Sequence, residues 1–374
     1  MIRLLSIIGA RPQIIKSAAI SRAIQTFFSN DVQEKVLHTG QHYDANMSQI
    51  FFDELGIPAP DFNLGVGSGN HGMQTAHIIE GIENILLNER FDGVILYGDT
   101  NSTLAGSIAA AKLSIPVFHI EAGLRSYNMA MPEEINRIVC DQLSSILFAP
   151  TKTAIENLSA EGLLTSPAVF SNKAKRMVIN CGDVMFDNAL YFSEMAEKQS
   201  RILESCSVQP DGYVLATIHR NFNTDVPDRI RSIFHAISYI ADTQDVPVVL
   251  PLHPRTRKFL PDRISSRVLI IPPVSFFDIL KLERNARLVM TDSGGVQKEA
   301  FFFSKPSIIF RPETEWVEII EHGAGALVDA DYNKIVSAYG LFRNKKVFFP
   351  PLFGDGHAAE KILGTIKVYL GTVC

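Results

Sequence analysis

Three carboxylates in the first half of the chain have the type and placement for proton transfer. Asp99 and Glu121 each follow a short apolar run, at 93–97 and 116–120, and Glu133 lies at the start of a helical stretch. Carboxylates that share one site can be driven to different pKa values, so that one acts as a base and another as an acid. We interpret all three as acid/base candidates. The structural alternatives are helix capping for Asp99 and a favourable first-turn charge for Glu133.

Basic side chains accompany these carboxylates. Arg11 lies in the turn 9–13 that follows an apolar run, and Lys16 lies one turn further along, inside a helical stretch. An arginine in such a turn can present a bidentate donor to an anionic ligand, although a solvated capping turn also explains it. Glu121 directly follows an apolar run, so burial should raise the pKa of its carboxyl group unless Arg125 pairs with it.

A glycine pair in the second half indicates a phosphate-binding turn. The run 288–300, LVMTDSGGVQKEA, starts as a buried strand, breaks at Ser293, Gly294 and Gly295, and continues as a helix. Two glycines let backbone N–H groups approach an anion, and the helix N-terminus adds partial positive charge. Ser293 suits helix capping or a phosphate contact, and Glu299 suits ribose hydroxyl groups. An ordinary strand–turn–helix is the structural alternative, because this motif alone is weak.

Three further polar positions follow apolar runs in the second half. His219 is interpreted as a contact to a phosphate or leaving group. His253 opens a basic segment, HPRTR, that indicates a second anionic contact or an exposed turn. Arg311 is placed to bind uracil or phosphate, or to pair with Glu313.

The loop 38–44 in the first half, HTGQHYD, crowds many hydrogen-bonding groups together, among them Gln41 and His42. It is interpreted either as a ligand-binding loop or as a turn in which Asp44 caps the next helix, which is expected near residues 45–55.

The elements that must position these residues alternate between apolar strand-like runs and amphipathic helical stretches. This alternation predicts an α/β class with doubly wound parallel sheets. We expect two domains, 1–176 and 177–357, with a linker near 172–183 and a last helix, 358–374, that belongs to either domain. Ligands of such sheets bind at the carboxyl ends of the strands, where the polar residues fall, so the site is expected between the domains. The expected strands are 4–8, 35–38, 93–97, 116–120, 147–149, 214–218, 248–252, 268–271, 288–290 and 307–310.

Composition narrows the function classes. With 374 residues, 46% hydrophobic and 20% charged, the chain can form a large core. The net charge of −5 argues against a nucleic-acid surface, and no apolar stretch is long enough to span a membrane. The four cysteines are scattered, which favours reduced thiols in the cytoplasm over a metal site. The fingerprints GxGxxG and GxxxxGK[ST] are absent at the expected strand ends, which disfavours nicotinamide and ATP chemistry.

Seven motifs together resemble the non-hydrolysing UDP-N-acetylglucosamine 2-epimerase family. They occur in family order over nearly the whole chain, which makes the set far more specific than any single member. The motifs are GARPQIIK (9–16), HTGQHYD (38–44), YGDTNSTLAG (97–106), HIEAGLRS (119–126), MPEEINR (131–137), TIHR (217–220) and TDSGGVQKEA (291–300).

The resemblance implies a GT-B fold of two Rossmann-like domains and a reaction without metal or redox cofactor. A base removes the proton from carbon two of the sugar while UDP leaves carbon one, and UDP adds back to the bound glycal with a proton on the opposite face. This interconverts UDP-GlcNAc and UDP-ManNAc for surface polysaccharide synthesis, in a homodimeric enzyme. By motif match, the acid/base residues are Asp99, Glu121 and Glu133, His219 contacts the departing pyrophosphate, Arg11 and Arg137 orient the ligand, and UDP is bound by Ser293, Gly294, Gly295, Glu299 and Arg311.

The chain departs from the usual family pattern at several positions. Gln13 stands where the family has Glu, and Trp316 replaces the Arg of TERPE. Gln41, His42 and His253 match the region where some members bind a second, activating substrate molecule. The combination of GARPQ and TEWVE is closer to the branch acting on UDP-2,3-diacetamido-2,3-dideoxyglucuronate, which is the alternative substrate.

Two other classes of function remain as alternatives. A GT-B glycosyltransferase shares the Gly-Gly diphosphate turn but needs an acceptor, and the three carboxylates favour the epimerase over it. A non-catalytic sensor of sugar nucleotides would bind without turnover.

Overall fold

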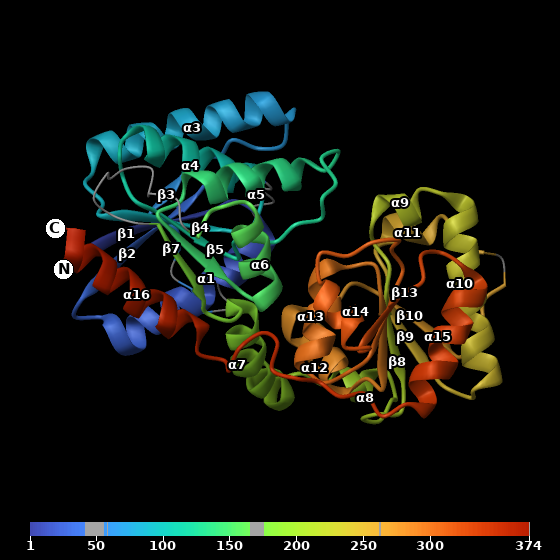
Figure 1. The fold of residues 1–374 in the computed structure, drawn as a ribbon. Coiled ribbons are helices and arrows are strands. Elements are labelled where there is room, and N and C mark those ends of the chain that lie inside the picture. Colours follow the sequence, from blue (N-terminus) through green and yellow to red (C-terminus); the bar gives the residue numbers. More distant parts are fainter. Residues whose placement is uncertain (42–55, 58, 165–175, 262, 374) are drawn as a thin grey trace. The chain divides into compact units, whose positions relative to one another are not determined.

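The computed structural model describes residues 1–41, 56–57, 59–164, 176–261 and 263–373. The chain forms two compact units (Figure 1): Met1–Asn188 together with Leu352–Cys374, and Ala189–Pro351. Each unit has its own parallel sheet with helices on both faces. The predicted α/β class with two doubly wound sheets is therefore confirmed.

Seven parallel strands form the sheet of the first unit, in the order β3-β2-β1-β4-β5-β6-β7. The central strands are short apolar runs that are buried on both faces, as strands of a covered parallel sheet must be. The strands are β1 (Ile2–Ile8), β2 (Val32–His38), β3 (Phe62–Asn63), β4 (Gly93–Tyr97), β5 (Val117–Ile120), β6 (Ile146–Ala149) and β7 (Met177–Asn180).

Helices cover both faces of this sheet. On one face, side chains of α3, α4 and α5 form a core with those of the first strands. Gly106 of α4 lets this helix approach β4 closely, since a Cβ there would lie 2.6 Å from Leu96 Cδ2. On the other face, Tyr369 of α16 meets Phe118 of β5 edge to face. The helices are α1 (Arg11–Ala23), η1 (Ile24–Phe28), α3 (His71–Asn88), α4 (Asn101–Lys112), α5 (Pro132–Leu143), α6 (Lys152–Ala160) and α16 (Ala358–Val373), and α7 (Val184–Gln199) leads into the second unit.

Six parallel strands form the sheet of the second unit, in the order β10-β9-β8-β11-β12-β13. The strands are β8 (Val214–Thr217), β9 (Val248–Pro251), β10 (Val268–Ile271), β11 (Leu288–Thr291), β12 (Ser307–Ile309) and β13 (Gly325–Leu327). Helices α10 and α15 pack on one face, and α8, α12 and α13 pack on the other. The helices are α8 (Ile202–Ser205), α9 (Asn221–Thr224), α10 (Pro227–Thr243), α11 (Pro254–Arg257), α12 (Phe276–Asn285), α13 (Gly294–Phe302), α14 (Val317–Glu321) and α15 (Tyr332–Asn344).

In both sheets the order of the strands reverses between two neighbouring central strands, the switch point of the sheet. In the first unit the pair is β1 and β4, and in the second it is β8 and β11. Doubly wound sheets bind ligands in the crevice at the carboxyl ends of the strands at such a point. Arg11 and Asp99 follow the pair in the first unit, and His219 and Ser293 follow the pair in the second, so the topology places one group of polar residues at the switch point of each unit.

The structure corrects the organisation expected from the sequence. The linker predicted near 172–183 contains β7, which pairs with β6, so the first unit extends past the expected border at 176. The last helix, α16, belongs to the first unit. The short strands β3 and β13 were not predicted, and the helix expected near residues 45–55 lies outside the described part of the chain.

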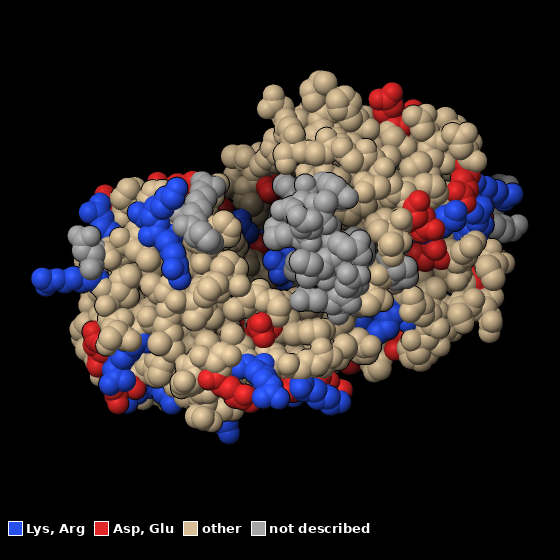
Figure 2. All heavy atoms as spheres, turned by 180° about the vertical axis from the view of Figure 1, so that it is seen from behind, with Lys and Arg blue, Asp and Glu red and all other residues tan. Residues whose placement is uncertain are grey.

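Most of the described surface in Figure 2 is formed by residues other than Asp, Glu, Lys and Arg, and where charged side chains gather on this face, acidic and basic ones lie next to one another. Among the described residues, no helix is long and apolar enough to cross a membrane. The same residues contain no group of three or more His, Cys, Asp or Glu side chains arranged to hold a metal ion.

Candidate active site

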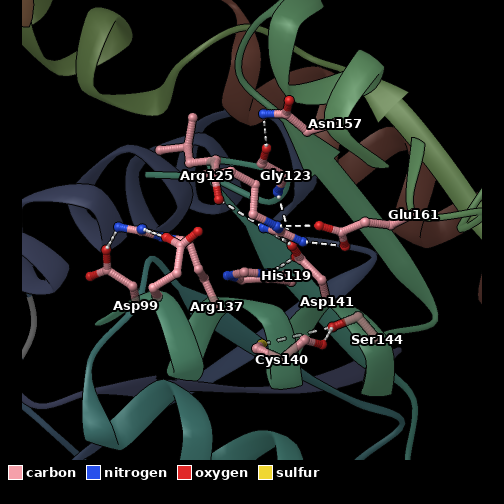
Figure 3. A network of polar contacts seen from close by, with 12 residues as sticks. Asp99, His119, Gly123, Arg125, Arg137, Cys140, Asp141, Ser144, Asn157 and Glu161 are labelled. Atoms are coloured by element: carbon pink, nitrogen blue, oxygen red, sulfur yellow. Dashed lines mark hydrogen bonds and ion pairs between the residues drawn. The ribbon is translucent and has the colours of Figure 1, made fainter. Parts of the chain in front are cut away.

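Asp99 lies in the turn between β4 and α4, beside the switch point of the first unit. Thr100, not Asp99, caps α4, because its hydroxyl oxygen accepts a hydrogen bond from the Thr103 N–H at 3.4 Å. The Asp99 carboxylate is therefore available for another partner, and Arg137 of α5 donates to it at 2.5 Å (Figure 3). This excludes the capping role considered for Asp99 and leaves a partly buried carboxylate, 30% exposed, paired with a cation.

Glu121 follows β5 and has a left-handed backbone conformation, with φ of 71°. Its carboxylate pairs with the Lys16 ammonium group at 2.5 Å, and the side chain of each residue is only 10% exposed. Arg125, the partner considered from the sequence, binds Asp141 and Glu161 through its guanidinium group. Left-handed backbone is costly for a residue with a side chain, so this strain marks a position that the surrounding structure fixes.

The two ion pairs lie side by side around Gly98. A Cβ atom on Gly98 would lie 3.1 Å from Lys16 Nζ and 3.4 Å from a Glu121 carboxylate oxygen, and the residue has a φ of 62°. Burial raises the pKa of Asp99, and the charge of Glu121 adds to that rise, while Arg137 and Lys16 lower it, so that the pKa lies above its ordinary value. The arrangement therefore gives two carboxylates different electrostatic environments at one point.

Glu133 is exposed in the first turn of α5, whereas its neighbour Glu134 is 1% exposed. The Glu134 carboxylate accepts hydrogen bonds from the backbone N–H groups of Ser126 and Tyr127 and pairs with Arg137. Burial acts to raise the pKa of Glu134, but these donors and the Arg137 charge outweigh it and lower the pKa below its ordinary value. Glu134 thus holds Arg137 against Asp99. Glu134 was not among the residues predicted from the sequence, although its spacing of three residues from Arg137 is that of one helix face.

Arg11 and Gln13 occupy the turn after β1. Arg11 is exposed at the first position of α1, which fits both a ligand contact and the solvated arginine of a capping turn. Gln13 is buried, and its amide oxygen accepts from the N–H groups of Gly9 and Ala10. Its amide nitrogen donates to the Tyr97 carbonyl at 2.8 Å. The glutamine that replaces the usual glutamate therefore supplies an N–H donor that a carboxylate lacks.

The candidates for a second ligand site have different surroundings. Gln41 is buried, and its amide oxygen accepts from the backbone N–H of Ser102 at 3.0 Å and from the Ser102 hydroxyl at 2.7 Å. Its side chain therefore supports the N-terminus of α4. His253 is exposed after β9, and His42 lies outside the described residues.

Asp292 organises the switch point of the second unit. It is fully buried after β11 and accepts hydrogen bonds from the backbone N–H groups of His219 and Arg220 and from the Asn223 amide. Its carboxylate also lies 3.2 Å from Nδ1 of His219, whose side chain is 56% exposed. Asp292 thus fixes the loop after β8 and leaves the His219 ring facing solvent. Asp292 was not among the residues predicted from the sequence, although it directly follows a strand and precedes the glycine pair.

The glycine turn begins α13 as predicted. The Ser293 hydroxyl caps the helix by accepting from the Val296 N–H at 3.3 Å. The two glycines differ: a Cβ on Gly294 would lie 2.3 Å from a Glu315 carboxylate oxygen, whereas the nearest atom to a Cβ on Gly295 is 3.8 Å away. Glu299 lies one turn further along the same helix, partly exposed. The surface of the turn at Gly295 is therefore open, and the surface at Gly294 is covered.

Arg311 pairs with Glu315 at 2.9 Å, so Glu315 replaces the Glu313 partner considered from the sequence. Trp316, where the family has an arginine, is buried, and the Lys298 ammonium group lies 4.2 Å from its ring centroid. A cation therefore remains near this position, stacked on the aromatic ring that replaces the arginine.

A family model described as UDP-N-acetylglucosamine 2-epimerase matches residues 26–367. The UDP-2,3-diacetamido-2,3-dideoxy-D-glucuronate 2-epimerase of Pseudomonas aeruginosa is 47% identical over 363 residues, which cover 96% of this chain and 98% of that protein. The UDP-N-acetylglucosamine 2-epimerase of Methanocaldococcus jannaschii is 40% identical and covers 96% of each chain.

Solved structures show the same likeness in three dimensions. The UDP-GlcNAc 2-epimerase of Methanocaldococcus jannaschii, solved with UDP-GlcNAc and UDP, has a TM-score of 0.84 at 39% identity and covers 98% of this chain and 100% of its own. A Phytolacca americana protein solved with UDP-2-fluoro-glucose and pterostilbene has a TM-score of 0.60 at 12% identity, over 100% of this chain and 94% of its own, which shows the fold alone. These likenesses span both compact units and confirm the GT-B arrangement of two Rossmann-like domains.

Proposed function

The chain belongs to the UDP-N-acetylglucosamine 2-epimerase family, and on that premise we propose that it inverts the configuration at carbon two of a UDP-linked acetamido sugar. The observation that carries the proposal is the cluster around Gly98. There the Asp99–Arg137 and Glu121–Lys16 pairs place two carboxylates of different environment at the switch point of the first sheet. Proton removal and proton return at one carbon require two such groups.

In the proposed reaction, one carboxylate takes the proton from carbon two while the bond between carbon one and the UDP oxygen breaks. The product of this step is UDP and a 2-acetamidoglucal. UDP then adds back to carbon one while a second group delivers a proton to the other face of carbon two. Asp99 and Glu121 are our acid/base candidates, and Glu133, exposed at the start of α5, is the third. Arg11, Lys16 and Arg137 orient the ligand.

The second unit is proposed to bind UDP. Gly294 and Gly295 begin α13, and the turn is open at Gly295, so this helix N-terminus suits a diphosphate. The exposed His219 ring, aligned by Asp292, suits the leaving phosphate, where a ring N–H donor would stabilise the charge that develops. Glu299 is proposed to accept hydrogen bonds from the ribose, and Arg311 to contact the nucleotide.

Two UDP-sugars are candidates for the substrate. UDP-GlcNAc, with UDP-ManNAc as product, is the substrate expected from the family resemblance. UDP-2,3-diacetamido-2,3-dideoxyglucuronate is favoured by the 47% identity to the Pseudomonas aeruginosa protein, against 40% to the Methanocaldococcus jannaschii enzyme. We therefore propose the diacetamido sugar as the first substrate to test and UDP-GlcNAc as the second.

The deciding experiment is proton NMR in heavy water with each UDP-sugar and no acceptor. Deuterium at carbon two and a manno-configured product are expected for the true substrate. If neither sugar exchanges, but the donor is consumed once an acceptor is added, the chain is a glycosyltransferase. Binding without either reaction would indicate a sensor.

We also propose that the protein is a cytoplasmic homodimer that serves polysaccharide biosynthesis. The three cysteines that the structure describes, Cys140, Cys181 and Cys206, are buried free thiols, which suits a reducing compartment. Light scattering after size-exclusion chromatography measures the oligomeric state, and a mass of one chain would reject the dimer.

A further inference from the structure

Three successive carbonyl groups in the turn after β4 each accept a hydrogen bond from a side chain. The Tyr97 carbonyl accepts from Gln13 at 2.8 Å and from Thr103 at 2.7 Å. The Gly98 carbonyl lies 2.8 Å from Nε2 of His119, and the Asp99 carbonyl accepts from the Asn136 amide at 2.9 Å. These donors come from α1, α4, β5 and α5, so the peptide planes on both sides of Asp99 are fixed from several directions.

His119 is the ionisable donor in this set. It is fully buried in β5, and its second ring nitrogen, Nδ1, lies 2.7 Å from a carboxylate oxygen of Asp141. A carbonyl and a carboxylate both only accept hydrogen bonds, so both ring nitrogens must carry a proton. The two contacts therefore describe an imidazolium, independent of the tautomer chosen for a neutral ring.

A row of side chains with alternating charge leads from this imidazolium through Asp141 and Arg125 to Glu161 (Figure 3). Asp141 also accepts from the Gly123 N–H at 3.1 Å and pairs with Arg125 at 2.8 Å. Arg125 in turn binds Glu161 through two nitrogens, at 2.6 and 2.7 Å. Both charges of the buried His119–Asp141 pair thus have partners, which is the condition under which a buried ion pair is tolerated.

The charge on His119 agrees with its surroundings. Burial alone lowers the pKa of the ring, but the neighbouring Cys140 and Asp141 side chains raise it, and the pKa lies well above its ordinary value. Asp141 responds in the opposite direction: burial raises its pKa, while His119 and Arg125 lower it below the ordinary range.

We propose that His119 is a positioning residue of the reaction: as a buried imidazolium it fixes the Gly98–Asp99 peptide through Nε2–H and so holds the Asp99 carboxylate where Arg137 and the sugar meet it. Gly98 has a left-handed backbone, with φ of 62°, and glycine has no side chain to limit rotation of this peptide. The hydrogen bond from His119 supplies that limit. This inference rests on the proposed epimerase function, and it assigns the role to a residue that does not touch the substrate.

Two substitutions of His119 test its contact with the Gly98 carbonyl separately from its contact with Asp141. His119→Gln places an amide N–H near the position of Nε2, so it keeps a donor for the Gly98 carbonyl and loses the donor to Asp141. His119→Asn places an amide N–H near the position of Nδ1, so it keeps the donor to Asp141 and loses the donor to Gly98. Both remove the same charge, which makes them matched controls for each other.

We expect His119→Asn to lower kcat about 10²-fold, the scale of a small misplacement of a reacting group, with UDP affinity unchanged. We expect His119→Gln to retain most of kcat. Equal losses of kcat in the two variants, or full activity of His119→Asn, would overturn the proposal. Circular dichroism and thermal melting show whether each variant is folded.

A second measurement needs neither variant nor turnover. Long-range proton–nitrogen correlation spectra of the wild-type protein report the protonation of each ring nitrogen of His119. Both nitrogens are expected to be protonated at neutral pH, and a bare nitrogen would overturn the proposal. If the wild-type enzyme shows no exchange at carbon two, the proposed function fails, whereas the spectrum still tests the imidazolium.

Discussion

At the scale of single residues, the candidate site is defined by how each carboxylate is paired. Asp99 contacts Arg137, Glu121 contacts Lys16, and Glu134, which the sequence analysis passed over, aligns Arg137 from the other side. Burial raises the pKa of Asp99 despite its cation, whereas for Glu134 the backbone donors and Arg137 outweigh burial and lower the pKa below its ordinary value. Two predictions follow the pairing directly.

Asp99→Asn and Glu121→Gln should each lower turnover ~10²-fold or more, the usual effect of losing a general acid or base. Each amide keeps the shape of the side chain but cannot exchange a proton in the same way. Steady-state kinetics with the true substrate measures the loss, and Glu156→Gln, an exposed carboxylate on α6 paired with Lys152, is the control. Near-normal rates in both active-site variants would reject the assignment.

One limb of the pH–rate profile should reflect the ionisation of Asp99. In Arg137→Gln this limb should move to higher pH. Arg137 lowers the pKa of Asp99, which burial has raised, so removing the cation lets the pKa rise further. The ionised form of Asp99 then requires a higher pH. Arg137→Lys keeps the charge and should shift the limb less. A profile that is unchanged in Arg137→Gln would show that Asp99 does not titrate in the reaction.

At the scale of elements, the strand-to-helix turns do the positioning. The first unit uses the turns after β1, β4 and β5, and the second unit uses those after β8 and β11. In each unit a buried side chain ties neighbouring turns together: Gln13 links the turn after β1 to the end of β4, and Asp292 links the turn after β11 to that after β8. Residues distant in sequence thereby keep fixed geometry.

Gly294→Ala should weaken UDP binding. Gly295→Ala should cause little loss of protein stability. A Cβ on Gly294 displaces the Glu315 carboxylate and so disrupts its pair with Arg311, whereas a Cβ on Gly295 has no protein atom within 3.8 Å. Calorimetry with UDP measures affinity, and thermal melting measures stability. Unchanged affinity in Gly294→Ala would separate this turn from nucleotide binding. Gly295→Ala points its methyl group toward the open surface, so a loss of UDP affinity without a loss of stability there would support diphosphate binding at the turn.

At the scale of the whole molecule, two units of the same architecture carry complementary chemistry. Carboxylates and their cations gather in the first unit, and the glycine turn and His219 lie in the second. Each group stands at the switch point of its own sheet. This division predicts that the nucleotide and the sugar protect different segments of the chain from hydrogen exchange.

Hydrogen exchange with saturating UDP should show protection of segments 217–223 and 291–299, because these turns are proposed to hold the nucleotide and a bound ligand suppresses local opening. Protection of 97–102 and 119–123 should require the UDP-sugar. Protection of the first-unit segments by UDP alone, with none in the second unit, would contradict the division.

The sequence predicted the α/β class, ten of the strands and the residues of both switch points, because buried parallel strands are apolar runs and the residues that follow them stand out as polar. It missed β3 and β13, which are only two and three residues long. It also placed a linker over β7, whose four residues MVIN follow a polar segment. Short strands leave too weak a pattern, and their pairing comes from neighbours in the sheet.

The sequence by itself determined which residue types the site contains and at which strand ends they lie. Only the tertiary structure decided their partners: Lys16 and not Arg125 for Glu121, Glu315 and not Glu313 for Arg311, and Glu134 beside Arg137. The physical reason is that the position of a residue after a strand depends on local chain pattern. The choice among nearby charges depends on distances across the sheet, between residues as far apart as 16 and 121, and on burial that the whole fold creates.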